Sequence, residues 1–363
     1  MAQISKGVGC RPETVARHIR LMKERGVYYG SMGLLCYRKL EMAYVPVLVT
    51  APLENLDAVY AACRAHPYIA YSVRTLRATN GAFLIFTQPC SAIPLLSEFL
   101  DELAARGIIT DHRIYICDDT KRDFLKADLD VFDSETAKWR YDWNMWQSCD
   151  STAKPDPAPT ELQSSAVEPE LNGLRKSDME LLRIISDDSG LPTEEMAKAA
   201  SLPSHAVRRR IRYLEENGFI IGYRPMIDYS QFHLSGSILF NCNASTSEIA
   251  VCRRRVLTLP FPGTFIPVQN GFLLHASISD EGLPALHRFL SGHCSDVAVS
   301  WFDLESSDVA LFNVKGYTNE GWQTDKTFLI DKPLEAIAKR APALRATNAF
   351  GDPFRAQPAK SAT

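Results

Sequence analysis

Residues 207–218 read VRRRIRYLEENG and residues 15–26 read VARHIRLMKERG, and these two stretches decide the organisation of the 363-residue chain. They align without gaps at an offset of 192 residues, which also pairs Gly30 with Gly222 and Tyr37 with Tyr229. Self-similarity at a fixed spacing is typical of a repeated structural unit. The sequence therefore predicts two tandem units, joined by a flexible linker over residues 149–173 that is rich in Pro, Ser, Ala and Glu.

Each repeated stretch belongs to a helix-turn-helix pattern. In the second unit, Ser177 and Glu180 predict a capping box at the start of helix one, and a short helix begins at Thr193. Ser204 is expected to cap a third helix that ends near Gly218, and residues 219–223 predict the first strand of a wing. The first copy lacks helix one, so we expect either a start codon placed too late or a degenerate copy.

Each winged helix is followed by predicted elements in the order βαββαβ, which is the ferredoxin-like arrangement. Asn80-Gly81 and Asn270-Gly271 each join two apolar strands, and both turn residues are expected at positive φ. The predicted fold class is α+β. The predicted domains are a winged helix over 1–40, a ferredoxin-like domain with a Trp-rich extension over 41–148, the linker over 149–173, a winged helix over 174–232, a ferredoxin-like domain with an extension over 233–347 and a disordered tail over 348–363.

Composition limits the function classes. Forty basic against forty-three acidic residues give a net charge of −3, so any DNA affinity must come from a local patch. Nine dispersed cysteines without Cys-x-x-Cys, and eight scattered histidines, predict neither a disulfide framework nor a metal site. The uncharged stretch over residues 82–97 is too short and polar to span a membrane, and the N-terminus has no signal-peptide pattern. We expect a soluble, cytoplasmic protein without membrane contact.

The third helix of each unit carries the predicted DNA-binding face. On a helical wheel Val207, Ile211 and Leu214 form an apolar stripe, and Arg210 flanks it, so Arg210 is expected in a structural salt bridge. The basic residues that we expect to contact DNA are His205, Arg208, Arg209, Arg212, Arg17, Arg20 and Lys23. The alternative is a solvated helix face that happens to be rich in arginine.

Aromatic residues crowd the extension of the first unit, where Trp139, Trp143 and Trp146 occur with Phe132 and Tyr141. Trp322 lies in a comparable extension of the second unit. We expect these aromatics to cover an open sheet face or to bridge the two units, the alternative being an aromatic ligand pocket. His275, inside an apolar strand, is expected to be a core or interface residue with a backbone partner.

The pattern Val207-x-x-Arg210-Ile211-x-x-Leu214-Glu215-x-x-Gly218-x-Ile220, with Gly222-Tyr223 and a βαββαβ domain after it, resembles the Lrp/AsnC family of transcription regulators. The resemblance covers residues 1–117 and 174–306. It implies a sequence-specific regulator that binds double-stranded DNA through two recognition helices per chain. It also implies a small-molecule effector, an intrachain pseudo-dimer of the two units, and further homo-oligomerisation of the chain. The family has a Gly-x-x-Asp type turn near its effector, whereas no Asp follows Asn80-Gly81 or Asn270-Gly271 here.

A second class with the same fused architecture is the sirohaem decarboxylases, which act on tetrapyrroles. They carry Arg-x-Gly after the wing and His-Asn-Tyr near the middle strands, whereas this chain has Gly222-Tyr-Arg-Pro and neither motif. We therefore expect no enzyme, no catalytic residues and no cofactor. A tetrapyrrole decarboxylase and a metabolite-binding or scaffold protein remain the alternatives to the regulator.

Overall fold

The computed structural model describes residues 2–117, 121–148, 173–234 and 236–337. The predicted tail over 348–363, and all of the predicted linker except Gly173, lie outside the described residues. Within the described ranges, no helix combines the length and the apolar character needed to cross a membrane.

The first unit begins with a helix pair and a strand, α1 (Ala2–Val8), α2 (Pro12–Glu24) and β1 (Tyr28–Leu35). Proline suits the first turn of α2, where its missing N–H costs nothing, and Gly26 at φ 67° ends the helix. Short 3-10 turns, η1 (Arg38–Leu40), η2 (Leu53–Asn55) and η3 (Cys90–Ala92), precede the larger elements. The βαββαβ part follows as β2 (Met42–Thr50), α3 (Leu56–Ala65), β3 (Ile69–Arg77), β4 (Gly81–Pro89), α4 (Ile93–Ala105) and β5 (Asp111–Ile114).

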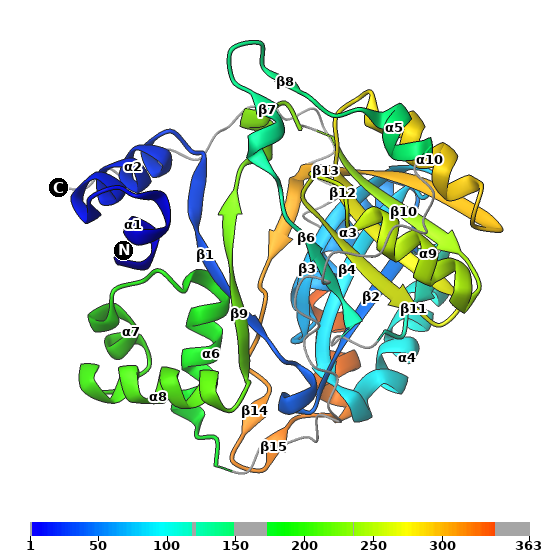
Figure 1. The fold of residues 1–363 in the computed structure, drawn as a ribbon. Coiled ribbons are helices and arrows are strands. Elements are labelled where there is room, and N and C mark those ends of the chain that lie inside the picture. The colour runs from blue at the N-terminus through cyan, green and yellow to red at the C-terminus, as the bar shows by residue number, and fades with distance from the viewer. Residues whose placement is uncertain (1, 118–120, 149–172, 235, 338–363) are drawn as a thin grey trace.

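The second unit repeats this order with a complete three-helix head, which lies beside the β1 and β9 strands in Figure 1. Its head comprises α6 (Lys176–Asp188), α7 (Thr193–Ala199), α8 (Ser204–Glu216) and the strand β9 (Ile220–Ile227). The turn η6 (Tyr229–Phe232) then leads to β10 (Ser237–Asn243), α9 (Thr246–Val256), β11 (Gly263–Val268), β12 (Gly271–Ser277), α10 (Gly282–Ser291) and β13 (Asp296–Val309). The prediction of two tandem units, each with a winged helix and a ferredoxin-like part, is confirmed.

Both predicted helix caps of the second unit are wrong. Helix α6 begins at Lys176, and the Arg175 backbone N–H donates to Asp178 Oδ2 at 2.8 Å, while Glu180 pairs with Arg183 instead. Ser204 is the first residue of α8 and makes no capping hydrogen bond. Asp178 is the stronger acceptor, because its carboxylate charge also favours the positive end of the helix.

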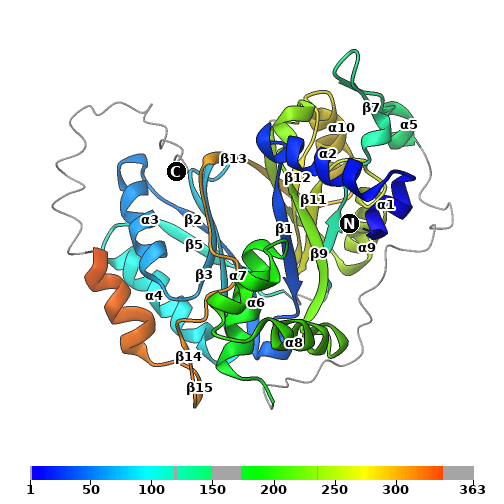
Figure 2. The same ribbon diagram turned by 90° about the vertical axis from the view of Figure 1, so that its left-hand side faces the viewer.

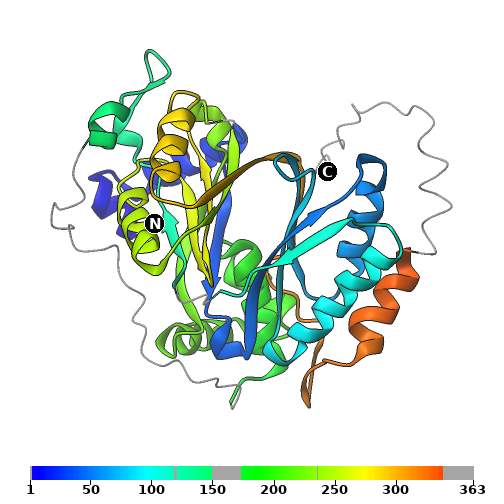
Figure 3. The same ribbon diagram turned by 90° about the vertical axis from the view of Figure 1, so that its right-hand side faces the viewer.

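The two units share one nine-stranded sheet with the order β5-β2-β4-β3-β13-β10-β12-β11-β6. Each half has the order expected of a ferredoxin-like fold, and the halves join where β13 pairs with β3, with Trp301 opposite Leu76. Figure 3 shows the long strand β13 passing from one half to the other. The inner faces of the two halves meet in a small core that includes Leu48, Phe83 and Leu273.

The wing strands pair across the units. β9 was expected to start a local wing, but it pairs antiparallel with β1 of the first unit, with Tyr223 opposite Gly33. Helix α6 packs on this ribbon so closely that a Cβ at Gly33 would lie 2.4 Å from Ile185 Cγ2. The head of the second unit is therefore built partly on a strand of the first.

The hairpins at Asn80-Gly81 and Asn270-Gly271 form, but not with the predicted backbone. Neither asparagine has a positive φ, and of the two glycines only Gly271 does, at 153°. Close approach requires glycine at both positions, because a Cβ at Gly81 would lie 1.9 Å from the Val49 carbonyl oxygen and one at Gly271 would lie 1.8 Å from that of Cys242. Each glycine thus lets its strand approach the neighbouring strand.

Each unit's extension packs on the other unit. After β5, the strand β6 (Asp123–Leu125) pairs with β11, and the hairpin of β7 (Phe132–Asp133) and β8 (Lys138–Trp139) leads to α5 (Trp143–Ser148), which packs on α10. After β13, the hairpin of β14 (Tyr317–Thr318) and β15 (Gly321–Trp322) leads to η7 (Thr327–Asp331) against α4. Trp143 stacks on Phe261, and Trp322 Nε1 donates to the Leu40 carbonyl at 2.8 Å. The aromatics bridge the units, as predicted.

Candidate functional site

The exposed face of α8 is the first candidate site, and Figure 2 shows α8 and α2 on the same side of the molecule. Val207 and Leu214 are buried, so the predicted apolar stripe faces the core. His205, Arg208, Arg209 and Arg212 are exposed, and none of them has a hydrogen bond or ion pair with any described residue. Four basic side chains are thus available to phosphates or bases.

Arg210 takes the structural role that its wheel position predicts. Its Nε and Nη2 donate to the two carboxylate oxygens of Asp178, both at 2.6 Å, and its guanidinium lies 4.3 Å from the centre of the Tyr213 ring. The Asp178 side chain is fully buried and that of Arg210 is 19% exposed. This bidentate pair joins α6 to α8 and fixes the angle between the two helices.

The equivalent face of the first unit is weaker. Arg17, Arg20 and Lys23 are exposed on α2, as expected, but Arg20 lies 4.0 Å from Glu24. Ile4 and Val8 are 48% and 60% exposed, whereas their counterparts at the 192-residue offset, Met196 and Ala200, are buried. Helix α6 packs on the second pair of helices, and the described part of the first unit has no helix in its place.

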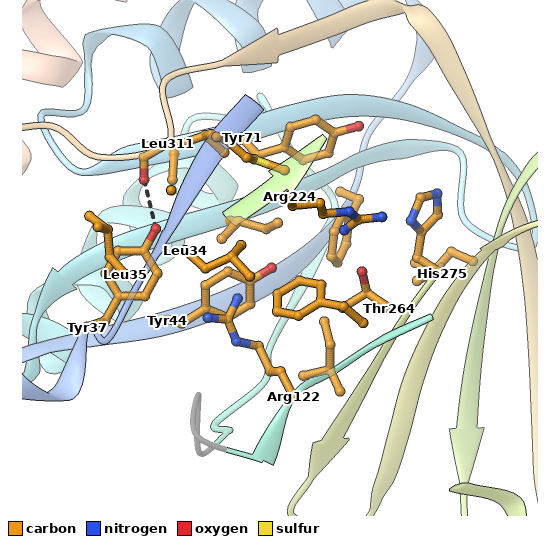
Figure 4. Close-up of a pocket in the computed structure, with 18 of the residues that line it drawn as sticks. Leu34, Leu35, Tyr37, Tyr44, Tyr71, Arg122, Arg224, Thr264, His275 and Leu311 are labelled. Atoms are coloured by element: carbon orange, nitrogen blue, oxygen red, sulfur yellow. Dashed lines mark hydrogen bonds between the residues drawn. The ribbon is translucent and has the colours of Figure 1, made fainter. Parts of the chain in front are cut away.

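A cavity of about 260 Å³ between the inner faces of the two half-sheets is the second candidate site. The β1–β9 ribbon closes it through Leu34 and Arg224, while Tyr44 and Tyr71 reach it from β2 and β3. Figure 4 shows Arg122 beside the ring of Tyr44, and Arg224 extending toward His275. Both units and both extensions line this cavity, the second extension through Leu311.

The cavity is cationic. Its described lining contains Arg122 and Arg224 but no Asp or Glu. The Arg122 guanidinium lies 3.9 Å from the centre of the Tyr44 ring, and that of Arg224 lies 5.3 Å from the centre of the Phe124 ring. Burial lowers the pKa of Arg224, which means that the surroundings do not compensate its positive charge. An anion is the natural complement of such a site.

The hydroxyl and imidazole groups of the cavity are neutral. Burial, assisted by the charge of Arg224, lowers the pKa of His275 to about 4, and its Nε2 lies 2.5 Å from Ser237 Oγ. The expectation of a backbone partner for His275 is wrong, because Ser237 lies beside it on the neighbouring strand β10. Burial also raises the pKa of Tyr71 and of Tyr44, so both phenols keep their protons at neutral pH.

Sequence reasoning did not identify Arg122 or Arg224 as site residues. Arg224 follows Gly222-Tyr223, and its inward direction results from the alternation of side chains along β9, which places Tyr223 outside and Arg224 inside. Arg122 lies in the extension, which reaches the cavity only because β6 joins the sheet of the other unit. Among the described residues, no group of three or more His, Cys, Asp or Glu is arranged to hold a metal ion.

Comparisons with known proteins identify relatives of the head and of the whole fold. Residues 174–221 match the family model for winged helix-turn-helix DNA-binding domains. The crystal structure of the siroheme decarboxylase NirDL aligns with 95% of this chain and 93% of its own, at a TM-score of 0.54 and 10% identity. NirDL in co-complex with an iron-uroporphyrin III analogue aligns with 83% of this chain and 84% of its own, at a TM-score of 0.52 and 11% identity.

A third structure, the transcriptional regulator NMB0573 from Neisseria meningitidis in complex with L-Met, aligns with 39% of this chain and 97% of its own, at a TM-score of 0.33 and 18% identity. No curated protein sequence matches the chain. The likeness to NirDL covers both units and concerns the fold.

The prediction that the protein is not an enzyme is wrong, because the structures that match 83% to 95% of the chain are those of an enzyme. That prediction depended on the absence of Arg-x-Gly and His-Asn-Tyr. The fold instead gathers arginine, tyrosine and histidine side chains from other positions into the cavity.

Proposed function

We propose that the cavity binds a carboxylate-bearing tetrapyrrole and that the protein removes a carboxyl group from one of its side chains. The observation that carries this proposal is the pair Arg122 and Arg224 in an otherwise apolar and aromatic cavity whose described lining has no acid. A guanidinium fork matches a carboxylate in a bidentate arrangement. NirDL is a siroheme decarboxylase, and one of its structures is a co-complex with an iron-uroporphyrin III analogue. Siroheme and uroporphyrin are both tetrapyrroles that carry carboxylate groups.

The volume of the cavity indicates how much of the substrate it encloses. Pockets that enclose a complete drug-sized ligand measure about 300–1,000 Å³, whereas this one measures about 260 Å³. The cavity therefore takes a carboxylated edge of the macrocycle, and the remainder of the ring lies outside it. Tyr44 and Phe124 flank the two arginines with aromatic surface for the ring edge.

The neutral hydroxyl groups supply the proton that decarboxylation consumes. When carbon dioxide leaves, the bond between the carboxyl carbon and the side-chain carbon breaks, and the electron pair stays on the side-chain carbon. That carbon takes a proton, which the Tyr71 phenol donates and water replaces. Burial keeps Tyr71 protonated at neutral pH, and a positioned acid of this kind contributes about 10²–10⁴-fold to the rate.

Titration with sirohaem tests the binding part of the proposal. We expect a shifted absorbance spectrum with wild-type protein and a loss of affinity of at least tenfold in Arg224→Ala, because the removed guanidinium is a partner of the carboxylate. Arg254→Ala is the matched control, since Arg254 is exposed on α9 away from the cavity. Equal affinity of the Arg224→Ala and wild-type proteins would contradict the proposed site.

A second function has its own support, because residues 174–221 match the DNA-binding family model and four basic side chains of α8 are free. We propose that α8 enters the major groove of duplex DNA with His205, Arg208, Arg209 and Arg212, and that α2 adds Arg17, Arg20 and Lys23. The two helices differ in sequence, so the site on DNA is asymmetric. This activity makes the protein a transcription regulator with two recognition helices in one chain.

A double substitution tests DNA binding. We expect Arg209→Ala with Arg212→Ala to abolish the gel shift obtained with DNA selected from a random pool, because two of the guanidinium groups that face phosphates or bases are removed. Arg254→Ala again serves as control, because it removes one exposed positive charge elsewhere. Unchanged binding by the double variant would exclude α8 as the DNA-reading helix.

A further inference from the structure

Three cysteines gather in the second unit on the side of the sheet opposite the cavity. Cys242 lies on β10, Cys252 on α9, and Cys294 in the connection between α10 and β13. Side chains alternate along a strand, so Leu239 faces the cavity while Cys242 faces the helices. The cluster is therefore separate from both candidate sites.

The geometry favours reaction between two of these thiols. Cys252 Sγ and Cys294 Sγ lie 4.0 Å apart, in van der Waals contact. Cys242 and Cys252 are fully buried, whereas Cys294 is partly exposed. A small oxidant from solvent can thus reach Cys294 but not its two neighbours.

Hydrogen bonding also distinguishes the exposed thiol. Hydrogen bonds from Cys242 and then Cys252 lower the pKa of Cys294 below the usual value for a thiol. The same contacts, together with burial, raise the pKa of Cys242 and of Cys252. The thiolate, which is the nucleophilic form, is therefore favoured on the one cysteine of the cluster that solvent reaches.

We propose that Cys294 is a peroxide-reactive cysteine and that Cys252 resolves it to a disulfide. The Cys294 thiolate attacks one oxygen of a hydroperoxide, the O–O bond breaks, and a sulfenic acid and water or an alcohol result after proton transfer. The Cys252 sulfur then attacks the sulfenic sulfur, the S–O bond breaks, and water leaves with the Cys252 proton. Two thiols are oxidised and one hydroperoxide is reduced.

Backbone freedom explains why Cys252 rather than Cys242 is the resolving residue. Cys242 lies one residue before the end of β10 but is paired on both sides, with Phe272 of β12 and Val297 of β13. Cys294 belongs to a short connection after α10, so it can move toward α9 without breaking strand pairing. The disulfide would tie α9 to this connection and leave the cavity and α8 unchanged.

Peptide mapping of the full-length protein tests the proposal. Reduced protein is treated briefly with equimolar hydrogen peroxide, blocked with a thiol alkylating reagent and digested without reductant. We expect a cross-linked peptide that joins Cys252 to Cys294, two hydrogens lighter than the separate peptides and released by dithiothreitol. In Cys252→Ser we expect a Cys294 sulfenic acid that dimedone traps, while Cys10→Ser, which changes an exposed cysteine of the first unit, leaves the cross-link intact.

Two results would overturn the proposal. One is a Cys294 thiol that stays reduced at a peroxide dose that oxidises the exposed Cys10 in the same wild-type sample. The other is a cross-link from Cys294 to Cys242 instead of Cys252. Both are read from wild-type protein, so the outcome does not depend on the folding of a variant.

Discussion

Two buried histidines connect single residues to the stability of the whole protein. His66 is buried between Phe86 and Phe99, and its Nδ1 accepts a hydrogen bond from the Tyr68 backbone at 3.2 Å. Its Nε2 has no hydrogen-bond partner among the described residues, and burial lowers the pKa of His66 to about 3. His275 behaves similarly, with a pKa of about 4. Both histidines therefore stay neutral in the folded protein at a pH where, in the unfolded chain, they bind a proton.

This difference predicts acid sensitivity. The unfolded chain binds protons near pH 6.5 while the folded protein does not, so the stability is fully present above that pH and is lost as the pH falls toward 4 and then 3. We expect urea unfolding to show a loss of about 2 kcal/mol for each histidine between pH 8 and pH 5. His66→Phe should remove the contribution of His66 to this dependence of the free energy of unfolding on pH. An unchanged slope in that variant would contradict the assignment.

For single residues, the sequence predicted a contact correctly where the geometry of one helix determined that contact. The wheel position of Arg210 predicted its salt bridge, because the angle relative to the apolar stripe fixes its place beside α6. Arg122 and Arg224 could not be found in this way. Their roles depend on a connecting segment and a strand whose partners lie in the other unit.

Among the elements, the pair of α6 and α8 depends on the buried Asp178 carboxylate. Removal of one partner from a buried ion pair leaves the other charge uncompensated and costs about 3–5 kcal/mol. We expect Asp178→Ala to lower the free energy of unfolding by about 3 kcal/mol. We also expect it to weaken DNA binding in proportion to the fraction of molecules in which the head of the second unit is unfolded.

A matched control lies on the same helix. Asp187 pairs with Arg183 at 3.0 Å on the surface of α6, with the carboxylate 47% exposed. An exposed pair contributes about 0–1 kcal/mol, so Asp187→Ala should change the free energy of unfolding by less than 1 kcal/mol. Chemical denaturation followed by far-UV circular dichroism measures both variants. Equal effects of the two substitutions would show that the buried pair has no special role.

The order of the elements was predictable, but the strand partners were not. The βαββαβ order followed from hydrophobic patterning and the Asn-Gly turns. The caps at Ser177 and Ser204 failed because the N-cap positions fall on Arg175 and Pro203, and Asp178 accepts the hydrogen bond at the start of α6. The partner of β9 is β1, whose residues are nearly two hundred positions away in the sequence, and local periodicity contains no information about such pairings.

At the scale of the whole molecule, each unit completes the other. The first extension covers the second unit through Trp143 and Trp146, and the second covers the first through Phe312 and Trp322. The repeat predicted two units, and the aromatic content predicted contact between them. Only the structure shows that these contacts, with β1 and β9, enclose a cationic cavity between the half-sheets.

If this cavity binds a carboxylated tetrapyrrole and decarboxylates it, the product of a single incubation shows the reaction. Purified protein is incubated anaerobically with sirohaem, and the extracted tetrapyrrole is analysed by mass spectrometry against a protein-free control. We predict a product lighter by carbon dioxide, formed by wild-type protein and Arg254→Ala but strongly diminished in Arg224→Ala and Tyr71→Phe. Recovery of unchanged sirohaem, with no shift of its absorbance spectrum on mixing with wild-type protein, would contradict the claim.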